Sequence, residues 1–348
     1  MTWMVYGANG YTGRLVARLA VELGERPTLA GRSRERVAPL AAELDLPYRI
    51  FDLVDGEATR AALSQVDIVA HCAGPFSATA VPMVRACVDS RTHYLDVTGE
   101  IAVFEEVFAR HADAADAGIV LLPGSGFDVV PTDCLAATLA AELPDARRLE
   151  LALSITGGAS PGTLKSVIES AGRGTFVRAA GGLRAIGSGH HVEVPFPSGV
   201  ASAMPIPWGD LVTAHRSTGI EEIATYLRVP RMPAVAQDLG TAVMKLPVVR
   251  RIATGLVDRF VPGPSEKTLA RSRSELWGRV TAASGETVSA TLTGPGPYPM
   301  TADAVVRAVR RLGSGVVRPG AHTPSSAFGA DFVRELDGVE VSVAPSFL

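Results

Sequence analysis

The amino-terminal glycine pattern limits most strongly how this chain can fold. A short apolar run at 3–6 is followed by three glycines, each three positions apart, and by a helix-like segment at 13–23. The first glycine permits a tight exit from a strand, the second lets the backbone approach a ligand, and the third lets the helix lie near the sheet. Free N–H groups and the dipole at a helix N-terminus attract phosphate. The pattern predicts a dinucleotide-binding turn, although a turn without a ligand fits the same spacing. The residues expected to contact the cofactor are Gly7, Asn9, Gly10, Tyr11, Thr12 and Gly13.

The first 135 residues alternate between short apolar runs and helix-like segments. The expected strands are 3–6, 28–30, 48–51, 68–71, 94–97 and 119–122, and the expected helices are 13–23, 34–44, 57–63, 81–88 and 103–117. Strands that helices cover on both faces show no clean polar alternation, as here. We therefore expect an α/β fold with a parallel, doubly wound sheet of the Rossmann type.

The pattern changes after residue 131, where longer strands and Gly-rich and Pro-rich stretches begin. A hairpin is expected at 276–283 and 287–292, followed by a helix at 301–312. We predict a Rossmann NADP-binding domain at 1–135 and an α+β substrate and dimerisation domain at 136–320. The C-terminal segment 321–348 is expected to pack back on the Rossmann domain.

The residues after the second expected strand indicate which dinucleotide is bound. NAD sites usually place a carboxylate there to hold the ribose 2′-hydroxyl, but this strand ends in Gly31-Arg32-Ser33. Arg32 can pair with a 2′-phosphate, and Ser33 can donate a further hydrogen bond. NADP is therefore the predicted cofactor, unless Arg32 is only a solvated charge at a helix start. Asp52, after the third strand, is expected either to receive the adenine amino group or to cap the next helix.

Composition excludes several other classes of protein. Lys and Arg number 33 against 36 Asp and Glu, a formal charge of −3, so the chain lacks the basic excess of nucleic-acid-binding proteins. The three cysteines show no metal-ligand spacing, so we expect reduced, buried thiols and no metal site. There is no signal-like amino terminus and no long uninterrupted apolar run, and we expect a cytoplasmic protein.

Three stretches after the fourth, fifth and sixth strands give the chain a family resemblance. They read CAGPF from Cys72, HYLDVTGE from His93 and GFDVVPTD from Gly126. Together with later segments across nearly the whole chain, they resemble the saccharopine dehydrogenase-like oxidoreductases, and within them the trans-acting enoyl reductase branch. The resemblance implies a Rossmann fold, a nicotinamide cofactor and a reductase whose substrates are lipid- or polyketide-like, as in lipid biosynthesis or secondary metabolism.

These loops lie at the carboxyl ends of strands, where doubly wound folds bind ligands. Gly74 is expected to approach the nicotinamide ribose, Pro75 to fix the turn and Phe76 to wall the nicotinamide ring, although packing alone also explains Phe76. Glu100 and Asp128 are expected to hold the ribose or carboxamide, orient substrate or relay a proton, or else to cap the following helices. The other cofactor contacts expected in these loops are Ala73, Gly99, Gly126 and Phe127.

The sequence does not single out a proton donor. The Tyr-x-x-x-Lys pair of short-chain dehydrogenases is absent from the corresponding place. Candidate catalytic residues are Asp128, Glu100 and Lys165, the last equally explained as part of a solvated helix face. Further possible donors, each also explained by ordinary packing, are Tyr11, His71, His93, His190 and His191.

The segment 232–260 has apolar residues at near-helical spacing, interrupted by basic residues. It is expected to pack on the core or on a second subunit of a homodimer, with peripheral membrane contact as an alternative. We predict an NADPH-dependent reductase acting on a C=C bond of a hydrophobic or carrier-bound substrate. The alternatives are an imine or ketone reductase of amino-acid-derived metabolism and a non-catalytic NADPH-binding protein that docks on membranes or partners.

Overall fold

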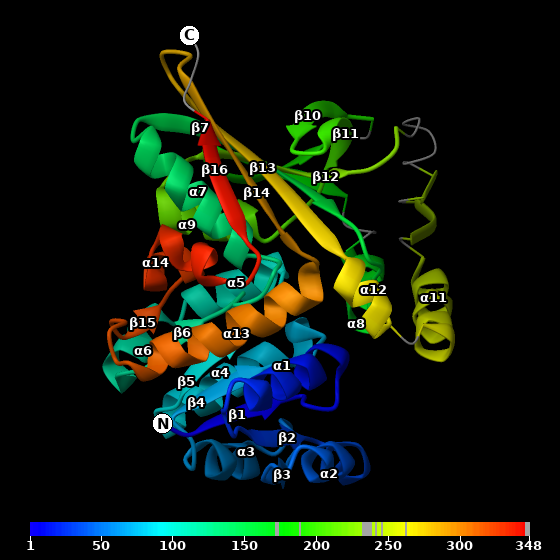
Figure 1. The fold of residues 1–348 in the computed structure, drawn as a ribbon, viewed down its shortest axis with the longest axis vertical. Helices are drawn as coiled ribbons and strands as arrows, with labels where there is room; N and C mark the ends of the chain where they lie inside the picture. Colours follow the sequence, from blue (N-terminus) through cyan, green and yellow to red (C-terminus); the bar gives the residue numbers. More distant parts are fainter. Residues whose placement is uncertain are drawn as a thin grey trace. The chain divides into compact units, whose positions relative to one another are not determined.

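The computed structural model describes residues 1–348 apart from 171–173, 188, 232–238, 241, 245, 262 and 345–348. The chain divides into two compact units (Figure 1). The first unit comprises Met1–Val130 and Pro297–Asp337, and the second comprises Pro131–Gly296 and Gly338–Leu348. Among the helices in the described part of the chain, none is long and apolar enough to cross a bilayer.

The first unit is built on a parallel sheet with the strand order β15-β6-β5-β4-β1-β2-β3. Every neighbouring pair in this order is parallel, as predicted, and the chain order reverses between β1 and β4. Such a reversal is where doubly wound folds bind their ligands. The six strands predicted from the sequence are confirmed, and a short seventh strand follows β6 at the sheet edge. Their bounds are β1 Trp3–Tyr6, β2 Thr28–Gly31, β3 Tyr48–Ile50, β4 Ile68–His71, β5 His93–Asp96, β6 Val120–Leu122 and β15 Gly320–Ala321.

The helices of the first unit connect these strands. The four residues of β1 are all buried, which explains why the strand shows no polar alternation. The helix expected at 103–117 is divided into two helices, α5 and α6. The helix bounds are α1 Tyr11–Glu22, α2 Arg34–Glu43, α3 Gly56–Leu63, α4 Phe76–Ser90, α5 Ile101–Phe108, α6 His111–Ala117, α13 Pro297–Gly313 and α14 Pro324–Phe328, with a 3-10 helix η1 at Ala330–Glu335.

The segment 297–337 completes the first unit from far along the chain. Helix α13 packs against α1, and the guanidinium of Arg310 donates to the carbonyl of Leu23 at 2.8 Å and pairs with Glu25 at 2.9 Å. The sequence placed this helix in a substrate domain that ends at residue 320, whereas the compact units divide at Gly296. Local periodicity predicts a helix but not which sheet that helix covers. From Gly338 onward the chain belongs to the second unit.

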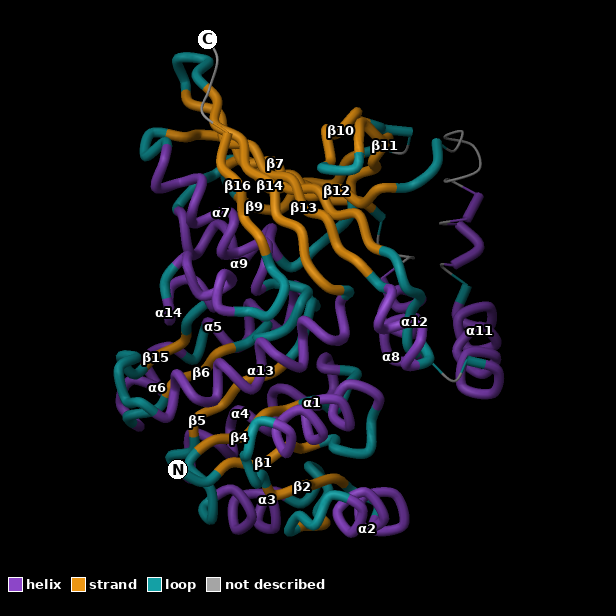
Figure 2. Tube along the Cα trace, in the orientation of Figure 1, coloured by secondary structure: helices purple, strands orange, loops and turns teal. Residues whose placement is uncertain are grey.

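The second unit contains a mixed sheet whose main path is β10-β11-β12-β7-β13-β14-β16 (Figure 2). Off this path, β8 pairs with β12, and β9 pairs with β8. Strands β7 and β12 are parallel, and the other neighbours on this path are antiparallel. The predicted hairpin is present as β13 and β14. The strand bounds are β7 Ala146–Ile155, β8 Thr175–Ala179, β9 Gly182–Ile186, β10 Val192–Phe196, β11 Gly199–Pro205, β12 Glu222–Arg228, β13 Arg273–Ala282, β14 Thr287–Pro295 and β16 Glu340–Ala344.

Helix α7 lies against one face of this mixed sheet. A Cβ atom on Gly278 of β13 would lie 2.7 Å from Leu139 of α7 and 3.2 Å from Leu151 of β7. The glycine therefore allows helix and sheet to approach closely. The helices of the second unit are α7 Val130–Glu142, α8 Pro161–Ser170, α9 Asp210–Thr218, α11 Pro247–Phe260 and α12 Glu266–Arg271.

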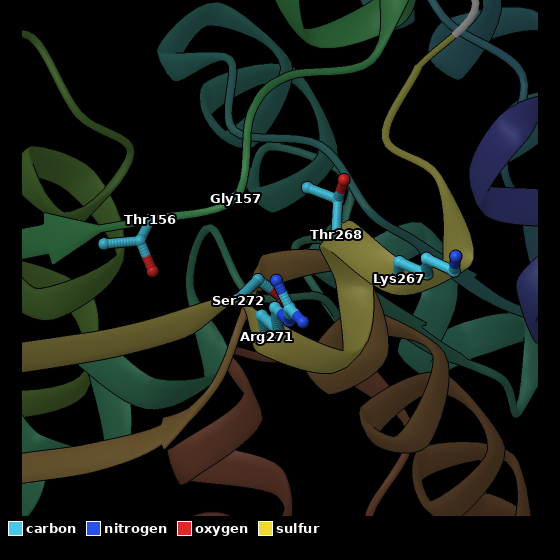
Figure 3. Close-up of a pocket in the computed structure, with 6 residues that line it drawn as sticks. All are labelled: Thr156, Gly157, Lys267, Thr268, Arg271 and Ser272. Atoms are coloured by element: carbon cyan, nitrogen blue, oxygen red, sulfur yellow. The ribbon is translucent and has the colours of Figure 1, made fainter.

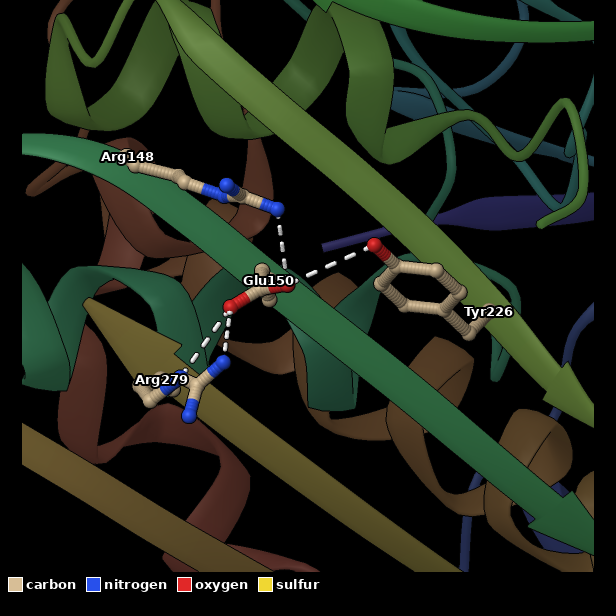
Figure 4. Close-up of polar contacts among 4 residues, drawn as sticks. All are labelled: Arg148, Glu150, Tyr226 and Arg279. Carbon is tan, nitrogen blue, oxygen red and sulfur yellow. Dashed lines mark hydrogen bonds and ion pairs between the residues drawn. The ribbon is translucent and has the colours of Figure 1, made fainter. Parts of the chain in front are cut away.

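The opposite face of β7 carries a buried carboxylate, Glu150, that is only 5% exposed. Figure 4 shows the Glu150 carboxylate between Arg148 of the same strand and Arg279 of β13. Arg148 donates to one carboxylate oxygen at 3.0 Å, and Arg279 donates twice to the other at 3.0 and 2.6 Å. The hydroxyl of Tyr226 lies 3.4 Å away, and burial together with the charge of Glu150 raises the pKa of this tyrosine. Because both guanidinium groups satisfy the buried carboxylate, the network stabilises three neighbouring strands.

Candidate dinucleotide site

The glycine turn between β1 and α1 is too closely packed for side chains. Gly7 has a φ of +82°, and a Cβ on it would lie 2.7 Å from the amide nitrogen of Ala73, in the loop after β4. A Cβ on Gly10 would lie 3.1 Å from the carbonyl oxygen of Gly7, and one on Gly13 only 2.3 Å from the same oxygen. Gly7 and Gly13 are therefore required by their neighbours, Gly10 leaves little room for a side chain, and the turn presents backbone rather than side chains.

The N-terminus of α1 begins directly at this turn. Gly10 is its N-cap and supplies no capping side chain, and the first turn contains no acidic residue. The positive end of the helix dipole is thus not neutralised locally, which favours an anionic ligand. Asn9 reaches towards the end of β2, because a Cβ on Gly31 would lie 3.1 Å from its amide oxygen. The predicted phosphate loop therefore adjoins the strand that carries Arg32.

The end of β2 exposes Arg32. Within the described ranges, its guanidinium forms no ion pair. Ser33 is the N-cap of α2, and its side chain makes no capping bond. Asp52 accepts a hydrogen bond from the amide of Val54 at 3.2 Å, whereas the cap of α3 is Asp55. The alternative in which Asp52 caps the next helix is therefore wrong.

The loop after β4 lies beside the glycine turn and leads into α4. Pro75 is the N-cap of this helix, and the ring of Phe76 meets His71 edge to face, with 5.3 Å between ring centres. The carboxylate of Glu100 accepts from the amides of Phe76 at 3.1 Å and Ser77 at 2.9 Å. Glu100 is the N-cap residue of α5, as one alternative expected, but its carboxylate makes no capping bond there and instead caps α4. It ties the loop after β5 to the loop expected to face the nicotinamide.

A buried acid at the end of β5, Asp96, was missed by the sequence analysis. It accepts from the hydroxyl of Tyr94 at 2.5 Å and from the amides of Thr98 at 2.9 Å and Gly124 at 2.8 Å. Burial raises the pKa of Asp96 to about 6, and these hydrogen bonds oppose the shift. Asp96 thus connects the loops after β5 and β6. The available signal was an aspartate within a short apolar strand.

The loop after β6 brings Asp128 against Gly99. A Cβ on Gly99 would lie 2.8 Å from a carboxylate oxygen of Asp128, and burial raises the pKa of this acid to about 6. Phe127 is 1% exposed, and its amide donates to the hydroxyl of Thr301 on α13 at 2.9 Å. A Cβ on Gly126 would lie 2.9 Å from Thr301. Helix α13 therefore holds this loop in place.

The candidate proton donors in the first unit have defined partners. His71 is fully buried, which lowers its pKa to about 3, and its Nε2 atom lies 3.0 Å from the hydroxyl of Thr79. Its imidazole is neutral near pH 7. The Nδ1 atom of His93 accepts from the amide of Val120 at 2.9 Å. The ring of Tyr11 meets Tyr298 edge to face at 4.8 Å, and burial raises the pKa of Tyr11 to about 12.

The remaining candidates, Lys165, His190 and His191, belong to the second unit. His191 lies 3.3 Å from the hydroxyl of Ser202. A polar pocket of about 270 Å³ is also present within this unit (Figure 3). Its lining residues are Thr156, Gly157, Lys267, Thr268, Arg271 and Ser272, and none of them was predicted to be catalytic. Among the residues described, no group of three or more His, Cys, Asp or Glu side chains is positioned to hold a metal ion.

The fold and the site define a Rossmann-type dinucleotide-binding protein. Residues 3–122 match the saccharopine dehydrogenase NADP binding domain. This match confirms the predicted NADP cofactor and the predicted resemblance for this domain.

Curated relatives extend the similarity beyond this domain. A Mycobacterium tuberculosis protein named as a trans-acting enoyl reductase is 31% identical over 182 residues, which cover 48% of this chain and 43% of the relative. A trans-acting enoyl reductase of Mycobacterium leprae is 34% identical over 138 residues, covering 37% of this chain and 33% of the relative. The chain thus covers less than half the length of these relatives.

Two solved structures share the fold over almost the whole chain. Saccharopine dehydrogenase (L-Glu forming) from Saccharomyces cerevisiae has a TM-score of 0.68 at 14% identity and covers 99% of both chains. Homospermidine synthase from Legionella pneumophila, in complex with NAD, has a TM-score of 0.66 at 10% identity and covers 99% of this chain and 91% of that one. At these identities the likeness concerns the fold alone.

Proposed function

We propose that the protein is an NADPH-dependent oxidoreductase that reduces a carbon–carbon double bond of a hydrophobic, lipid- or polyketide-like substrate. The observation that carries this proposal is the turn in which Gly7 lies against Ala73, next to an uncapped α1 N-terminus. That arrangement leaves backbone and helix dipole facing an anionic ligand. The match of residues 3–122 to an NADP-binding domain supports the cofactor.

The proposed roles of the cofactor-binding residues follow from their positions. The backbone from Gly7 to Gly13 holds the pyrophosphate, and Arg32 with Ser33 holds the 2′-phosphate that distinguishes NADPH from NADH. Asp52 contacts the adenine, and the loop from Ala73 to Phe76 faces the nicotinamide. The contacts after β5 and β6 come from Gly99, Gly126 and Phe127.

Bound NADPH supplies the hydride in this chemistry. Reduction of an α,β-unsaturated acyl group would need, besides a hydride at the β-carbon, a proton at the α-carbon. Asp128 is our candidate for holding this proton, because its raised pKa of about 6 keeps a fraction of it protonated near neutral pH. Glu100 is assigned a positioning role, because its carboxylate is engaged by the amides of Phe76 and Ser77.

The proposed substrate class rests on the names of the relatives. Proteins called trans-acting enoyl reductases match 37% to 48% of this chain, so we infer that the substrate is an enoyl group, presented on a carrier. A reduced imine or ketone is the competing outcome. It uses the same cofactor site but requires a different electrophile in the substrate.

The test combines cofactor binding with turnover by the purified full chain. Calorimetric titration with NADPH and NADH measures binding, and loss of NADPH absorbance measures turnover on enoyl thioesters, imines and ketones. We expect NADPH to bind more tightly than NADH and enoyl thioesters to be reduced. Binding of neither dinucleotide at millimolar concentration would exclude the proposal, and turnover of imines alone would reassign the substrate.

A further inference from the structure

Helix α11 carries more apolar surface than its packing uses. Within the second unit it packs against α8. Three of its apolar residues, Val249, Ala253 and Val257, recur every four positions and are half-buried. One apolar stripe of this kind is what a helix needs in order to pack on a neighbour. The part of the expected 232–260 segment before this helix includes 232–238, 241 and 245, which lie outside the described residues.

A second apolar stripe on α11 faces outward. Val248, Ile252, Leu256 and Phe260 also recur every four positions, so they lie on one side of the helix. Their exposed fractions are 68%, 58%, 52% and 67%, and Leu246, just before the helix, is 55% exposed. Single exposed apolar residues are ordinary, but a continuous row of large ones marks a surface that binds something.

Basic residues accompany the outward stripe. Helix α11 contains three arginines and one aspartate. Arg259 lies seven positions after Ile252, hence on the same side of the helix, and Arg251 lies at the edge of the stripe; both are exposed. The guanidinium of Arg259 lies 5.7 Å from the ring centre of Phe260. Long arginine side chains can reach around such a stripe to meet negative charges beside it.

We propose that the outward face of α11 binds an anionic lipid surface. A helix that lies in a membrane interface needs one apolar stripe and basic residues beside it, and α11 presents both. Two copies meeting along this face would bring the three arginines of each helix, against one aspartate, close together, which opposes a contact between copies. This surface makes no use of the cofactor site, so the inference stands apart from the proposed reaction.

Vesicle sedimentation with the full chain tests the proposal. The probes are phosphatidylcholine vesicles with and without phosphatidylglycerol, at low and high salt. The stripe variant combines Ile252→Ser with Leu256→Ser, and the charge variant combines Arg251→Ala with Arg259→Ala. The control variant combines Val54→Ser with Val316→Ser, because these side chains are 94% and 81% exposed in the first unit. All four altered apolar side chains are exposed, so the substitutions leave the core intact.

We expect the wild type to bind anionic vesicles, and the stripe variant to partition at least about tenfold less, since two apolar side chains no longer enter the interface. The charge variant should lose the preference for anionic lipid and the sensitivity to salt, and the control should behave as wild type. NADPH binding, measured in parallel, should be unchanged in all variants. Absence of vesicle binding by the wild type, or equal binding by the stripe variant, overturns the proposal. So does a dimer in sedimentation velocity that the stripe variant abolishes while vesicles remain unbound.

Discussion

Replacing Gly7 by alanine tests whether the contact between the glycine turn and the β4 loop shapes the dinucleotide site. The added Cβ would lie 2.7 Å from the nitrogen and 2.8 Å from the Cβ of Ala73. Carbon atoms pack at about 3.5–4.0 Å, so one of the two loops has to move. Gly7 also has a φ of +82°, a left-handed conformation that costs other residues about 1–2 kcal/mol.

Gly24→Ala is the matched control for this substitution. Gly24 follows α1 with a φ of +81°, and a Cβ on it would meet no atom within 4 Å. Gly24→Ala should therefore lower the free energy of unfolding only by the conformational cost of about 1–2 kcal/mol. Gly7→Ala should lose a further ~1–3 kcal/mol from overpacking. Since the moved loop is the proposed pyrophosphate contact, NADPH affinity should fall at least about tenfold in Gly7→Ala and stay unchanged in Gly24→Ala.

Urea unfolding gives the free energies of unfolding of both variants, and fluorescence titration gives their affinities for NADPH. The difference between the variants isolates the effect of the contact with Ala73, because their backbone conformations are nearly the same. Equal losses of stability together with equal NADPH affinity would show that the turn does not depend on this contact. The geometric reasoning for the site would then be refuted.

Three further substitutions test the cofactor choice, the buried acid and the ionic network. Arg32→Ala should weaken NADPH about 10- to 100-fold by calorimetry and leave NADH nearly unchanged, with Arg36→Ala as the control; equal weakening of both cofactors would contradict the 2′-phosphate role. Burial raises the pKa of Asp128 from 3.8 to about 6. Between pH 3.8 and about 6, Asp128 is largely ionised in the unfolded chain but still protonated in the folded chain. The free energy of unfolding therefore falls as the pH rises through this range. Asp128→Asn should therefore gain thermal stability relative to wild type across this window, and a constant difference would disprove the shift. Glu150→Ala should cost about 1–3 kcal/mol in urea unfolding, between the values for exposed and buried pairs. Glu193→Ala, at an exposed pair, should cost less than about 1 kcal/mol, and equal costs would argue against burial as the cause.

The parts of the site that the sequence predicted depend on local chemistry. Glycines three apart after an apolar strand required a close backbone turn, and the turn is present, with contacts that exclude a Cβ at Gly7 and Gly13. The loops after β4, β5 and β6 were also predicted from local sequence, because each follows a short apolar run. The sequence also shows that β2 is followed by Arg32 and Ser33 and not by a carboxylate.

What the sequence did not predict depends on contacts between distant segments. Glu100 stands at the N-cap of α5, but the sequence did not show that its carboxylate caps α4, which begins 24 residues earlier in the chain. Asp96 was not singled out, because its partner Gly124 becomes a neighbour only when β5 and β6 pair. A carboxylate in the sequence does not show which amides it will meet once the sheet has formed.

The C-terminal segment changes what counts as the cofactor-binding unit. The family match ends at residue 122, yet the loop after β6 is held by Thr301 of α13, whose hydroxyl accepts from the amide of Phe127. The same helix packs on α1 and carries Tyr298, whose ring meets that of Tyr11 at the start of α1. Residues 1–130 alone would lack these contacts and would expose the face of α1 that α13 covers. The first unit, which carries the proposed dinucleotide site, is therefore completed by a segment that follows every strand of the second sheet except β16.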